Sequence, residues 1–516
     1  MPVIYGICMA KIIIKGNTSQ IIEEADVEHI LALDKHLSFY IIGAEHTAAF
    51  KGYLNRDGDW VKWDGFKKLL TPTLQFPTGL VERIKDFYQE ANKPLEIMDR
   101  RTAKSTGKPR NILDNLKKIG KEPYPYQTEI LDVIDKYDRG IIKVATGGGK
   151  SLIAALIAAK LGKKTIIYVI GKDLLYQFHE FFSQCFDEPI GIIGDGQCII
   201  HDINIASVWT VGQAIGMKKN EILLDSDDDE NPLNKEKYAN ILKMMKETKL
   251  HIIDECHMSA CETIQQVFKH SASEYIYGLS GSPWRDDGAD LMIESILGKY
   301  IVNIPASRLI KEGYLAQPFI KFRVTPPYPY ELERQYQSIY KKYIVENDAR
   351  NGLVLEAAKA LVAKGYQTLV LFNSLKHGKI LHELFEEHMK CALLDGSNDK
   401  DEREKVKKDL MNHKIDCVLA SRIFDIGVDI PSLSGLVIAC GGKSTVKALQ
   451  RVGRVIRKYP GKKFAVVIDF ADQAPFLDNH SRIRHRIYTS EDGFDVLWPK
   501  EVKQSRKRKK KDEQDE

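Results

Sequence analysis

The stretch IIKVATGGGKSLIAALIAAKLG, residues 141–162, decides the fold. It opens with β-branched apolar residues, which predict a buried strand, and it ends in SLIAALIAAKLG, which predicts a helix. Between them Gly147, Gly148 and Gly149 let the backbone turn its N–H groups inward around phosphate oxygens. The N-terminus of the helix would face the same anion. The stretch therefore predicts an α/β domain that holds a phosphate group.

The residues around the glycines support this interpretation. Lys150 would reach the β and γ phosphates of a nucleotide, Ser151 would ligate Mg²⁺, and Thr146 belongs to the same loop. The usual spacing places a further glycine at position 144, where this chain has Val144. An ordinary strand-to-helix turn is the alternative, but the lysine and serine after the last glycine favour the phosphate site.

A second part of such a site must supply a carboxylate for the metal. Asp254 and Glu255 follow the apolar run LHII. Asp254 would hold Mg²⁺ through water, and Glu255 would orient or deprotonate the attacking water. Two acids at a strand end often only face solvent, but a phosphate loop upstream makes the catalytic interpretation the stronger one.

Apolar β-branched runs alternate with helical patterns twice along the chain. This alternation predicts two parallel sheets whose strands are buried on both faces. The expected strands are 141–145, 164–171, 203–208, 249–255 and 275–281, then 367–373, 390–396, 416–421, 434–440 and 463–470.

Composition narrows the function classes. The net charge of +5 is too weak to prove a nucleic-acid partner. The eight cysteines form no CxxC pair, so we expect neither a zinc ribbon nor a disulfide framework. We therefore expect the protein to work in a reducing compartment. No apolar run is long enough to predict a membrane span. The apolar start predicts a first strand rather than a signal peptide.

Three polar segments interrupt the pattern. Residues 99–118 are basic and poorly periodic, and we expect few contacts with the core to cross them. Residues 223–237 are acidic and predict an exposed loop. The tail 503–516 has a basic block followed by an acidic one and predicts disorder, with nonspecific phosphate binding as a further possibility.

ATGGGKS (145–151), DECH (254–257), LSGSP (279–283) and QRVGRVIR (450–457), in this order, resemble the motifs of superfamily 2 helicases of the DEAH/DECH-like kind. The resemblance covers about residues 122–470. It implies an α/β fold of two tandem RecA-like parallel-sheet domains, with a small α+β domain before them. ATP and Mg²⁺ are the implied cofactors.

The resemblance also implies roles for further residues. In PYPYQTEIL (123–131), Gln127 would hydrogen-bond adenine, and Tyr124 or Tyr126 would stack on it. His257 would couple the nucleotide to the nucleic acid, together with Ser280 and Ser282. Gly427 and Asp429 would lie near the ribose. Gln450, Arg454 and Arg457 would share one helix face, with both arginines directed at the γ-phosphate.

The N-terminal region resembles that of the phage UvsW-type recombination and repair helicases. The matching residues are Trp63, Asp64, Gly65, Phe76, Pro77, Gly79 and Leu80, and residues 468–488 also resemble that group. The resemblance implies an ATP-dependent DNA helicase or translocase that unwinds and branch-migrates forked or junction DNA in recombination, replication restart or repair. Branched DNA, with a single strand in the translocation groove, is the expected partner, and no protein partner is indicated.

Three other functions stay open. The first is an RNA helicase, because the motifs are shared and nothing in the sequence recognises a 2′-hydroxyl. The second is the motor subunit of a restriction or defence complex, although this chain shows no nuclease motif. The third is a non-catalytic binding module, which the intact Lys150, Glu255 and Arg457 argue against.

The expected domain organisation follows from these assignments. It is a DNA-recognition domain (1–105), a linker (106–121), an ATP-binding RecA-like domain (122–305), a second RecA-like domain (306–485) and a C-terminal segment (486–516). We expect a cytoplasmic location in a bacterial or phage-infected cell, with a nuclear one as the alternative.

Overall fold

The computed structural model describes residues 9–24, 26–54, 60–101, 103–217, 233–282, 289–327, 335–421 and 430–500, without the side chains at 48, 53, 54, 400 and 445–447. The chain forms two compact units, Met1–Pro305 and Ala306–Glu516. Gly427, Asp429, most of the acidic stretch 223–237 and the tail 503–516 lie outside the described residues.

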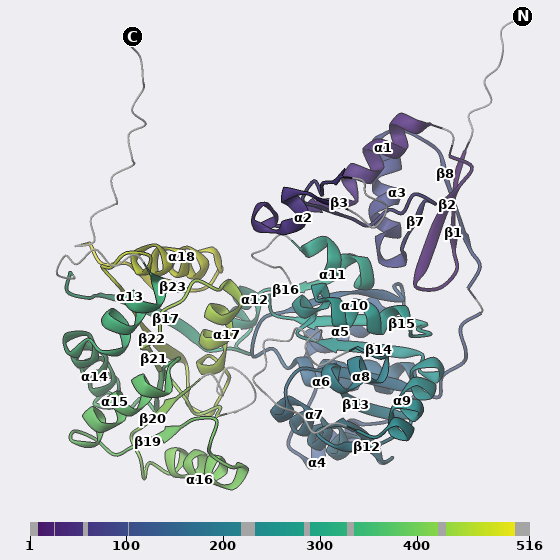
Figure 1. Ribbon diagram of the computed structural model, residues 1–516. Helices are drawn as coiled ribbons and strands as arrows, with labels where there is room; N and C mark the ends of the chain where they lie inside the picture. Colours follow the sequence, from purple (N-terminus) through teal and green to yellow (C-terminus); the bar gives the residue numbers. More distant parts are fainter. Residues whose placement is uncertain are drawn as a thin grey trace, which may run out of the picture. The chain divides into compact units, whose positions relative to one another are not determined.

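The first unit contains a large, mainly parallel sheet in the order β12-β11-β13-β10-β14-β15-β9-β16 (Figure 1). Only its edge strand β12 pairs antiparallel, with β11. The strands are β9 (Arg139–Val144), β10 (Thr165–Val169), β11 (Ile190–Gly194), β12 (Gln197–Ile199), β13 (Ile203–Ser207), β14 (Leu250–Asp254), β15 (Tyr275–Ser280) and β16 (Tyr300–Ile304). Each strand predicted in this region is confirmed.

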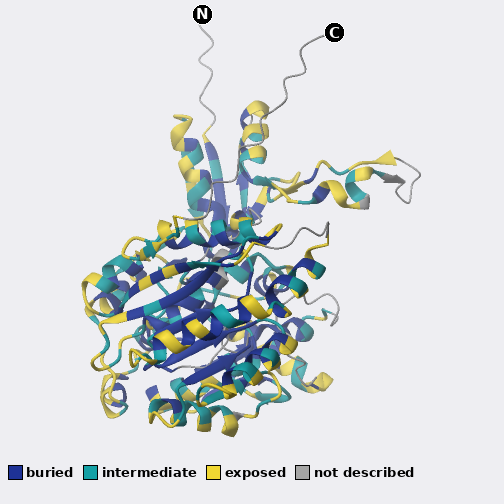
Figure 2. Cartoon of the chain, turned by 90° about the vertical axis from the view of Figure 1, so that its left-hand side faces the viewer, coloured by how far each residue is buried: buried dark blue, intermediate teal, exposed yellow. Residues whose placement is uncertain are grey.

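Helices cover both faces of this sheet. They are α4 (Leu113–Lys118), α5 (Pro125–Ile134), α6 (Lys150–Leu161), α7 (Lys172–Cys185), α8 (Val208–Ala214), α9 (Lys235–Glu247), α10 (Glu262–Lys269) and α11 (Asp290–Leu297). Strands β10, β11, β13 and β14 are buried at every position, which explains their unbroken apolar sequences. Figure 2 colours the whole chain by burial, with strands in dark blue and exposed stretches of helices in yellow.

A small sheet precedes this core, in the order β7-β2-β1-β8. Its strands are β1 (Ala10–Ile14), β2 (Thr18–Ile22), β7 (Gln75–Pro77) and β8 (Leu95–Asp99), and α1 (Val27–His36) and α3 (Val81–Glu90) lie beside it. An arm between α1 and β7 contains β3 (Ser38–Tyr40), α2 (Ala48–Lys51), β4 (Tyr53–Leu54), β5 (Trp60–Val61) and β6 (Phe66–Lys68). The small α+β domain expected at the N-terminus is therefore present.

The small domain packs directly on the large sheet's helices. Arg83 on α3 donates two hydrogen bonds to Glu294 on α11, with nitrogen–oxygen distances of 2.9 and 2.6 Å. Asn17 donates to the carbonyls of Phe268 and Ser271 at 2.8 and 3.2 Å. Leu291 of α11 is buried in the apolar core of the small domain. The two parts thus share a core within one unit.

Segment 99–118 does not behave as the non-contacting linker that its polarity predicts. The backbone N–H groups of Lys108 and Arg110 donate to the carbonyls of Gly162 and Ala159 at the end of α6, at 3.2 and 2.8 Å. Arg110 also forms an ion pair with Glu188. The expectation of few contacts is wrong because helix ends leave carbonyls that a passing polar backbone can satisfy.

The second unit is a parallel sheet in the order β19-β20-β18-β21-β22-β17-β23. Its strands are β17 (Gln317–Val324), β18 (Thr368–Leu371), β19 (Cys391–Leu394), β20 (Cys417–Ala420), β21 (Gly435–Ile438), β22 (Phe464–Ala471) and β23 (Asp495–Leu497). Its helices are α12 (Ala306–Lys311), α13 (Tyr336–Tyr340), α14 (Asp348–Val362), α15 (Leu375–Glu386), α16 (Lys400–Met411), α17 (Thr445–Val455) and α18 (Leu477–Ser490). The second series of predicted strands is confirmed, and with it the fold of two tandem parallel-sheet domains.

The C-terminal segment begins later than expected. Helix α18 runs past position 486 to Ser490, and β23 then pairs parallel with β17. Trp498 lies against Phe322 and His485, with ring centroids 4.8 and 4.7 Å apart. Residues 486–500 therefore belong to the second unit. Among the described residues, no helix is both long enough and apolar enough to cross a bilayer.

Gly79 lies where the backbone of the small domain comes close to the backbone of α11. A Cβ atom there would lie 2.2 Å from the carbonyl oxygen of Glu294 and 2.4 Å from that of Ser295. We expect Gly79→Ala to lower the free energy of unfolding by about 1–3 kcal/mol, because the added methyl group would force backbone atoms to move. Urea denaturation measures this loss.

The matched control is Gly352→Ala on α14, where a Cβ atom would meet nothing within 4 Å. It should raise stability by about 0.5–1 kcal/mol, since alanine favours a helix interior. Equal midpoints for Gly79→Ala and the wild-type chain would contradict the described packing.

Candidate nucleotide site

The glycine loop joins β9 to α6. Gly147 and Gly149 have φ values of 90° and 75°, in the left-handed region that glycine tolerates best, and Gly149 is the N-cap of α6. Val144 is the last residue of β9 and is fully buried. The missing glycine at 144 thus falls on a strand residue, and the loop is built without it.

Two predicted adenine-site residues contact this loop from α5. Gln127 donates its amide to the carbonyl of Gly148 at 3.3 Å and accepts the backbone N–H of Tyr124 at 2.9 Å. The hydroxyl of Tyr126 donates to the same carbonyl of Gly148 at 2.8 Å. Gln127 is 1% exposed. In this structure its amide supports the glycine loop, a role that the sequence does not reveal.

The two acids lie at the end of β14, beside the loop. Lys150 Nζ donates to Glu255 Oε1 at 2.9 Å. Burial disfavours the Lys150 ammonium, but the carboxylates of Glu255 and Asp254 outweigh it and raise the pKa of Lys150. Asp254 itself is buried. A positive side chain and two carboxylates are thus gathered within reach of the loop.

Glu255 has a strained backbone. Its φ and ψ angles are 50° and 55°, which few residues other than glycine adopt. Such strain persists only where the surrounding structure enforces it, and it concentrates at functional sites. Here it turns the Glu255 side chain toward Lys150 rather than along the strand.

The coupling residues join the same cluster. Ser280 Oγ lies 3.4 Å from both Glu255 Oε2 and His257 Nδ1, and it accepts the backbone N–H of Ser282 at 3.2 Å. These residues meet because β14 and β15 are parallel neighbours, with Asp254 opposite Leu279. A Cβ atom at Gly281 would lie 2.7 Å from Thr146 Oγ1, so the turn after β15 also touches the glycine loop.

The residues present fit a magnesium nucleotide. Loop amides and Lys150 suit phosphate oxygens, while Ser151 in the first turn of α6 and buried Asp254 have oxygen atoms that could bind the metal. The described residues contain no cluster of three or more histidine, cysteine or acidic side chains suited to a metal. Mg²⁺ needs only one or two carboxylates, because substrate phosphates and water complete its coordination.

The arginine motif lies in the second unit. Gln450 and Arg454 are on α17, but that helix ends at Val455. Arg457 forms an isolated bridge with Leu315 instead, and the Ala316 N–H donates to the Ile456 carbonyl at 2.7 Å. The expectation that all three share a helix face is therefore wrong for Arg457, because the backbone leaves the helix to pair with the chain before β17.

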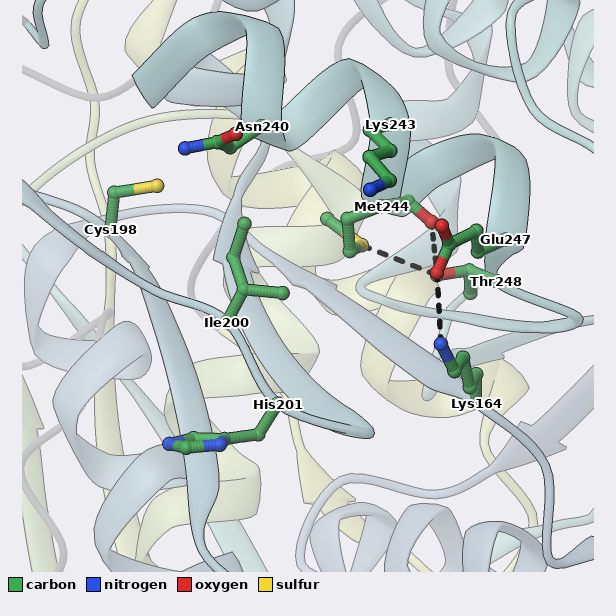
Figure 3. Close-up of a pocket in the computed structure, with 9 residues that line it drawn as sticks. All are labelled: Lys164, Cys198, Ile200, His201, Asn240, Lys243, Met244, Glu247 and Thr248. Atoms are coloured by element: carbon green, nitrogen blue, oxygen red, sulfur yellow. Dashed lines mark hydrogen bonds and ion pairs between the residues drawn. The ribbon is translucent and has the colours of Figure 1, made fainter. Parts of the chain in front are cut away.

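A separate cavity lies near the edge of the first unit's large sheet. It has a volume of about 410 Å³ and contains none of the predicted site residues. Figure 3 shows its lining residues, Lys164, Cys198, Ile200, His201, Asn240, Lys243, Met244, Glu247 and Thr248. Lys164 is paired with Glu247 at 2.8 Å, and this cavity offers no glycine loop for phosphate.

Two protein families match the chain. "Type III restriction enzyme, res subunit" matches residues 120–285, and "Helicase conserved C-terminal domain" matches residues 353–459. The first match covers the glycine loop and both acids, and the second covers the arginine motif. The chain belongs to the superfamily 2 helicases. Members of this superfamily use ATP, so the enzyme is an ATP-dependent helicase.

Three relatives of this helicase come from two viruses and an archaeon. "ATP-dependent DNA helicase uvsW" of Enterobacteria phage T4 is 27% identical over 436 residues, covering 80% of this chain and 82% of its own. "DNA 3'-5' translocase XPB2" of Sulfurisphaera tokodaii is 26% identical over 400 residues, covering 67% and 82%. A Sulfolobus islandicus filamentous virus protein is 27% identical over 354 residues, which are 64% of this chain but only 60% of that protein.

A solved structure supports the fold. Yeast Dbp5 bound to RNA and ADP BeF3 is 12% identical, with a TM-score of 0.51, over 75% of this chain and 92% of its own. The crystal structure of T4 UvsW covers 95% of this chain and 98% of its own, at 21% identity and a TM-score of 0.42.

The Lys150–Glu255 pair gives a test of the site. We expect Lys150→Ala to weaken ATP binding about tenfold to a hundredfold, since it removes a charge-assisted contact to phosphate. Glu255→Gln should leave ATP bound and abolish hydrolysis, because it keeps the shape of the side chain and removes the base. Fluorescent-nucleotide binding and phosphate release measure the two effects.

The control is Lys160→Ala at the other end of α6, where the lysine pairs with Asp135 at 2.6 Å. It should change neither ATP binding nor turnover. Near-wild-type turnover in Glu255→Gln would rule out the assigned base.

Proposed function

We propose that this helicase is an ATP-driven DNA motor that unwinds and branch-migrates forked or junction DNA in recombination, replication restart or repair. The observation that carries the proposal is the contact of Lys150 with Glu255 at 2.9 Å, beside a glycine loop and a buried aspartate. Two relatives named for activity on DNA, uvsW and XPB2, support DNA as the substrate.

The chain's own residues would divide the work on ATP. Lys150 would leave Glu255 for the phosphates, and Glu255 would then orient or deprotonate water. Ser151 and Asp254 would hold Mg²⁺, which neutralises phosphate charge when bound. His257 lies close to both Glu255 and Ser280. It would transmit a movement of the Glu255 side chain to the turn after β15.

The arginines of the second unit would act on the transition state. Arg454 and Arg457 would stabilise charge that develops on the γ-phosphate, with Gln450 assisting. Gly427 and Asp429 stay predicted ribose-side residues. The adenine roles of Tyr124 and Gln127 also stay predictions, and a nucleotide would have to share Gln127 with Gly148.

The arm of the small domain provides a surface suited to unpaired bases. Trp60 is 66% exposed, and Val61 and Phe66 are also exposed. Lys62 Nζ lies 5.4 Å from the centroid of the Phe50 ring. Exposed rings beside lysines combine base stacking with attraction to the DNA backbone. Trp63 differs, because its ring N–H donates to the Phe66 carbonyl at 2.8 Å and holds the arm together.

An ATPase titration with single-stranded DNA, forked DNA, a four-way junction and RNA tests the proposed substrate. We expect DNA to stimulate ATP hydrolysis, and we expect a fork or junction to stimulate it most. Stimulation by RNA alone would favour the RNA helicase. Hydrolysis that requires a further protein would favour a motor subunit, and no hydrolysis at all would favour a binding module. The cytoplasmic location stays a prediction.

Arg457→Ala tests the arginine assignment. We expect kcat to fall by about 10³-fold or more while ATP affinity changes little, because the guanidinium meets charge that appears mainly in the transition state. Steady-state kinetics and nucleotide binding separate the two. Arg486→Ala, at an exposed arginine of α18, is the control and should match the wild-type enzyme. A loss confined to affinity would mean that Arg457 contacts the ground state.

Trp60→Ala tests the arm. We expect affinity for forked DNA to fall roughly fivefold to a hundredfold, which corresponds to about 1–3 kcal/mol of lost stacking. Fluorescence anisotropy measures it. Ile42→Ala removes an apolar side chain that is also 66% exposed but cannot stack, and should have little effect. Equal fork affinities for Trp60→Ala and wild type would exclude this role.

A further inference from the structure

The turn that places α17 is packed at its start, where Ala439 and Cys440 are fully buried and the Cys440 N–H donates to the Leu371 carbonyl at 3.1 Å, but it is open around Gly442. It joins β21 to α17 through residues 439–444 and includes Gly441 and Gly442. Gly442 has a φ of 127°, and a Cβ atom there would meet nothing within 4 Å. Two adjacent glycines give a backbone many accessible conformations. Something other than packing around Gly442 must therefore fix the start of the arginine-bearing helix.

Arg484 of α18 holds the turn at Gly442. Its guanidinium donates to both oxygens of Asp469, at 2.9 and 2.8 Å, and its remaining terminal nitrogen donates to the Gly442 carbonyl at 2.7 Å. Arg484 and Asp469 are 2% and 0% exposed. Burial opposes the charge on Arg484, but Asp469 outweighs it and raises the pKa of the guanidinium. The planar guanidinium of Arg484 thus binds a buried carboxylate and also donates to the turn.

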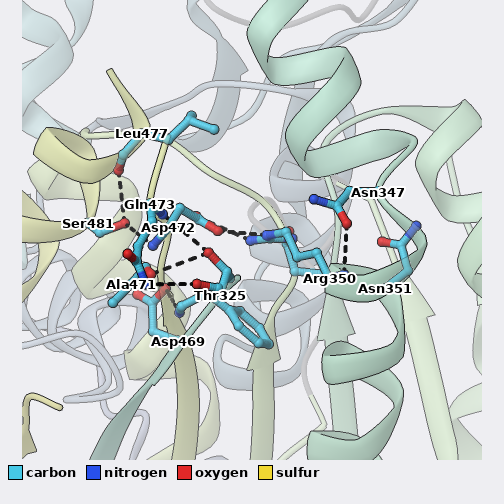
Figure 4. A network of polar contacts seen from close by, with 12 residues as sticks. Thr325, Asn347, Arg350, Asn351, Asp469, Ala471, Asp472, Gln473, Leu477 and Ser481 are labelled. Carbon is cyan, nitrogen blue, oxygen red and sulfur yellow. Dashed lines mark hydrogen bonds and ion pairs between the residues drawn. The ribbon is translucent and has the colours of Figure 1, made fainter. Parts of the chain in front are cut away.

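Arg350 of α14 repeats the arrangement at the other end of the turn. It donates to Asp472 at 2.7 and 3.4 Å and to the Ala439 carbonyl at 2.6 Å. Its guanidinium carbon also lies 4.9 Å from the centroid of the Phe470 ring. Figure 4 shows Arg350 directed at Asp472, beside Thr325 and Gln473 at the ends of β17 and β22. Arg350 and Asp472 are 1% and 3% exposed.

Asn373, just after β18, contacts the middle of the turn. Its amide nitrogen lies 3.5 Å from the Gly441 carbonyl, and its amide oxygen accepts from Arg451 of α17 at 3.3 Å. Carbonyls at 439, 441 and 442 are therefore each approached by a side chain from a different element. The two arginines rest on carboxylates at the end of β22, the strand next to β21.

We propose that Arg484, Arg350 and Asn373 are positioning residues for the arginine motif, and that they set where Gln450 and Arg454 on α17, and Arg457 after it, are presented. This inference rests on the proposed function, because it assigns these residues a role in the same ATP hydrolysis. Buried ion pairs are often no more stabilising than apolar side chains of similar size, so stability alone does not explain two of them beside one turn.

The test compares two double variants of the full-length chain. Arg484→Met with Asp469→Asn removes both charges of the buried pair, which avoids leaving an unpaired buried charge. We expect this variant to retain a cooperative thermal transition. Its kcat for DNA-stimulated ATP hydrolysis should fall about tenfold to a hundredfold, because a small misplacement of a catalytic group is enough for such a loss. Its KM for ATP should stay within about twofold.

The matched control is Arg323→Met with Glu356→Gln. Arg323 also binds a carboxylate, Glu356 at 2.9 Å, and a carbonyl, that of Leu353 at 3.3 Å, but neither belongs to the turn. The control should keep kcat and KM within about twofold of wild type. An equal fall of kcat in the control would overturn the inference, as would a folded Arg484→Met, Asp469→Asn variant with unchanged kcat.

Asn373→Ala is the second variant, at a half-buried position where folding should survive. It should lower kcat more than it raises KM, and unchanged kcat would count against the inference even if the double variant failed to fold. A wild-type chain without nucleic-acid-stimulated hydrolysis would refute the proposed function and this inference together. An active wild type with unaffected variants would refute the inference alone.

Discussion

The contact between Lys150 and Glu255 depends on one constraint, the parallel direction of β9, β15 and β14. Parallel neighbours end at the same edge of a sheet, so residues more than a hundred positions apart in the chain arrive side by side. The glycine loop after β9, the serines at the end of β15 and the acids at the end of β14 all meet at this edge. Their chemistry follows from that arrangement, since the carboxylates of Glu255 and Asp254 stabilise the charge on the half-buried Lys150.

The same constraint organises the second unit. Asp469 lies near the end of β22 and Asp472 follows it, while the turn to α17 leaves β21, its parallel neighbour. Carboxylates at one strand end can therefore control the backbone leaving the next strand. In the first unit the edge presents charged groups to a ligand. In the second unit the buried arginines donate hydrogen bonds to backbone carbonyls of the turn before α17. The residues that we assign to ATP hydrolysis lie on that helix and just after it.

The sequence could predict what periodicity and local order determine. Strands such as 203–208 and 434–440 are mostly apolar because both faces are covered, and each lies within two residues of its predicted bounds. The glycine loop and the acids could be predicted because adjacent residues carry them. The match of both helicase families falls on these same stretches.

What the sequence could not predict depends on partners distant along the chain. In the sequence, Arg484 looks like an ordinary charged residue on the surface of a helix. Only the fold shows that it is buried against Asp469. Segment 99–118 looks like a free linker until the open carbonyls at the end of α6 lie beside it. Arg457 follows the helical spacing of its neighbours, yet pairing with Leu315 takes it out of the helix. In each case a tertiary contact overrides a local pattern.

Hydrogen–deuterium exchange of the full chain, with and without a non-hydrolysable ATP analogue and Mg²⁺, tests the nucleotide site most directly. If phosphates accept hydrogen bonds from the glycine loop, exchange should slow at residues 146–151 and around Glu255, and should stay unchanged at the cavity lined by His201 and Lys243. Slower exchange at that cavity, with none at the loop, would contradict the assignment of the site.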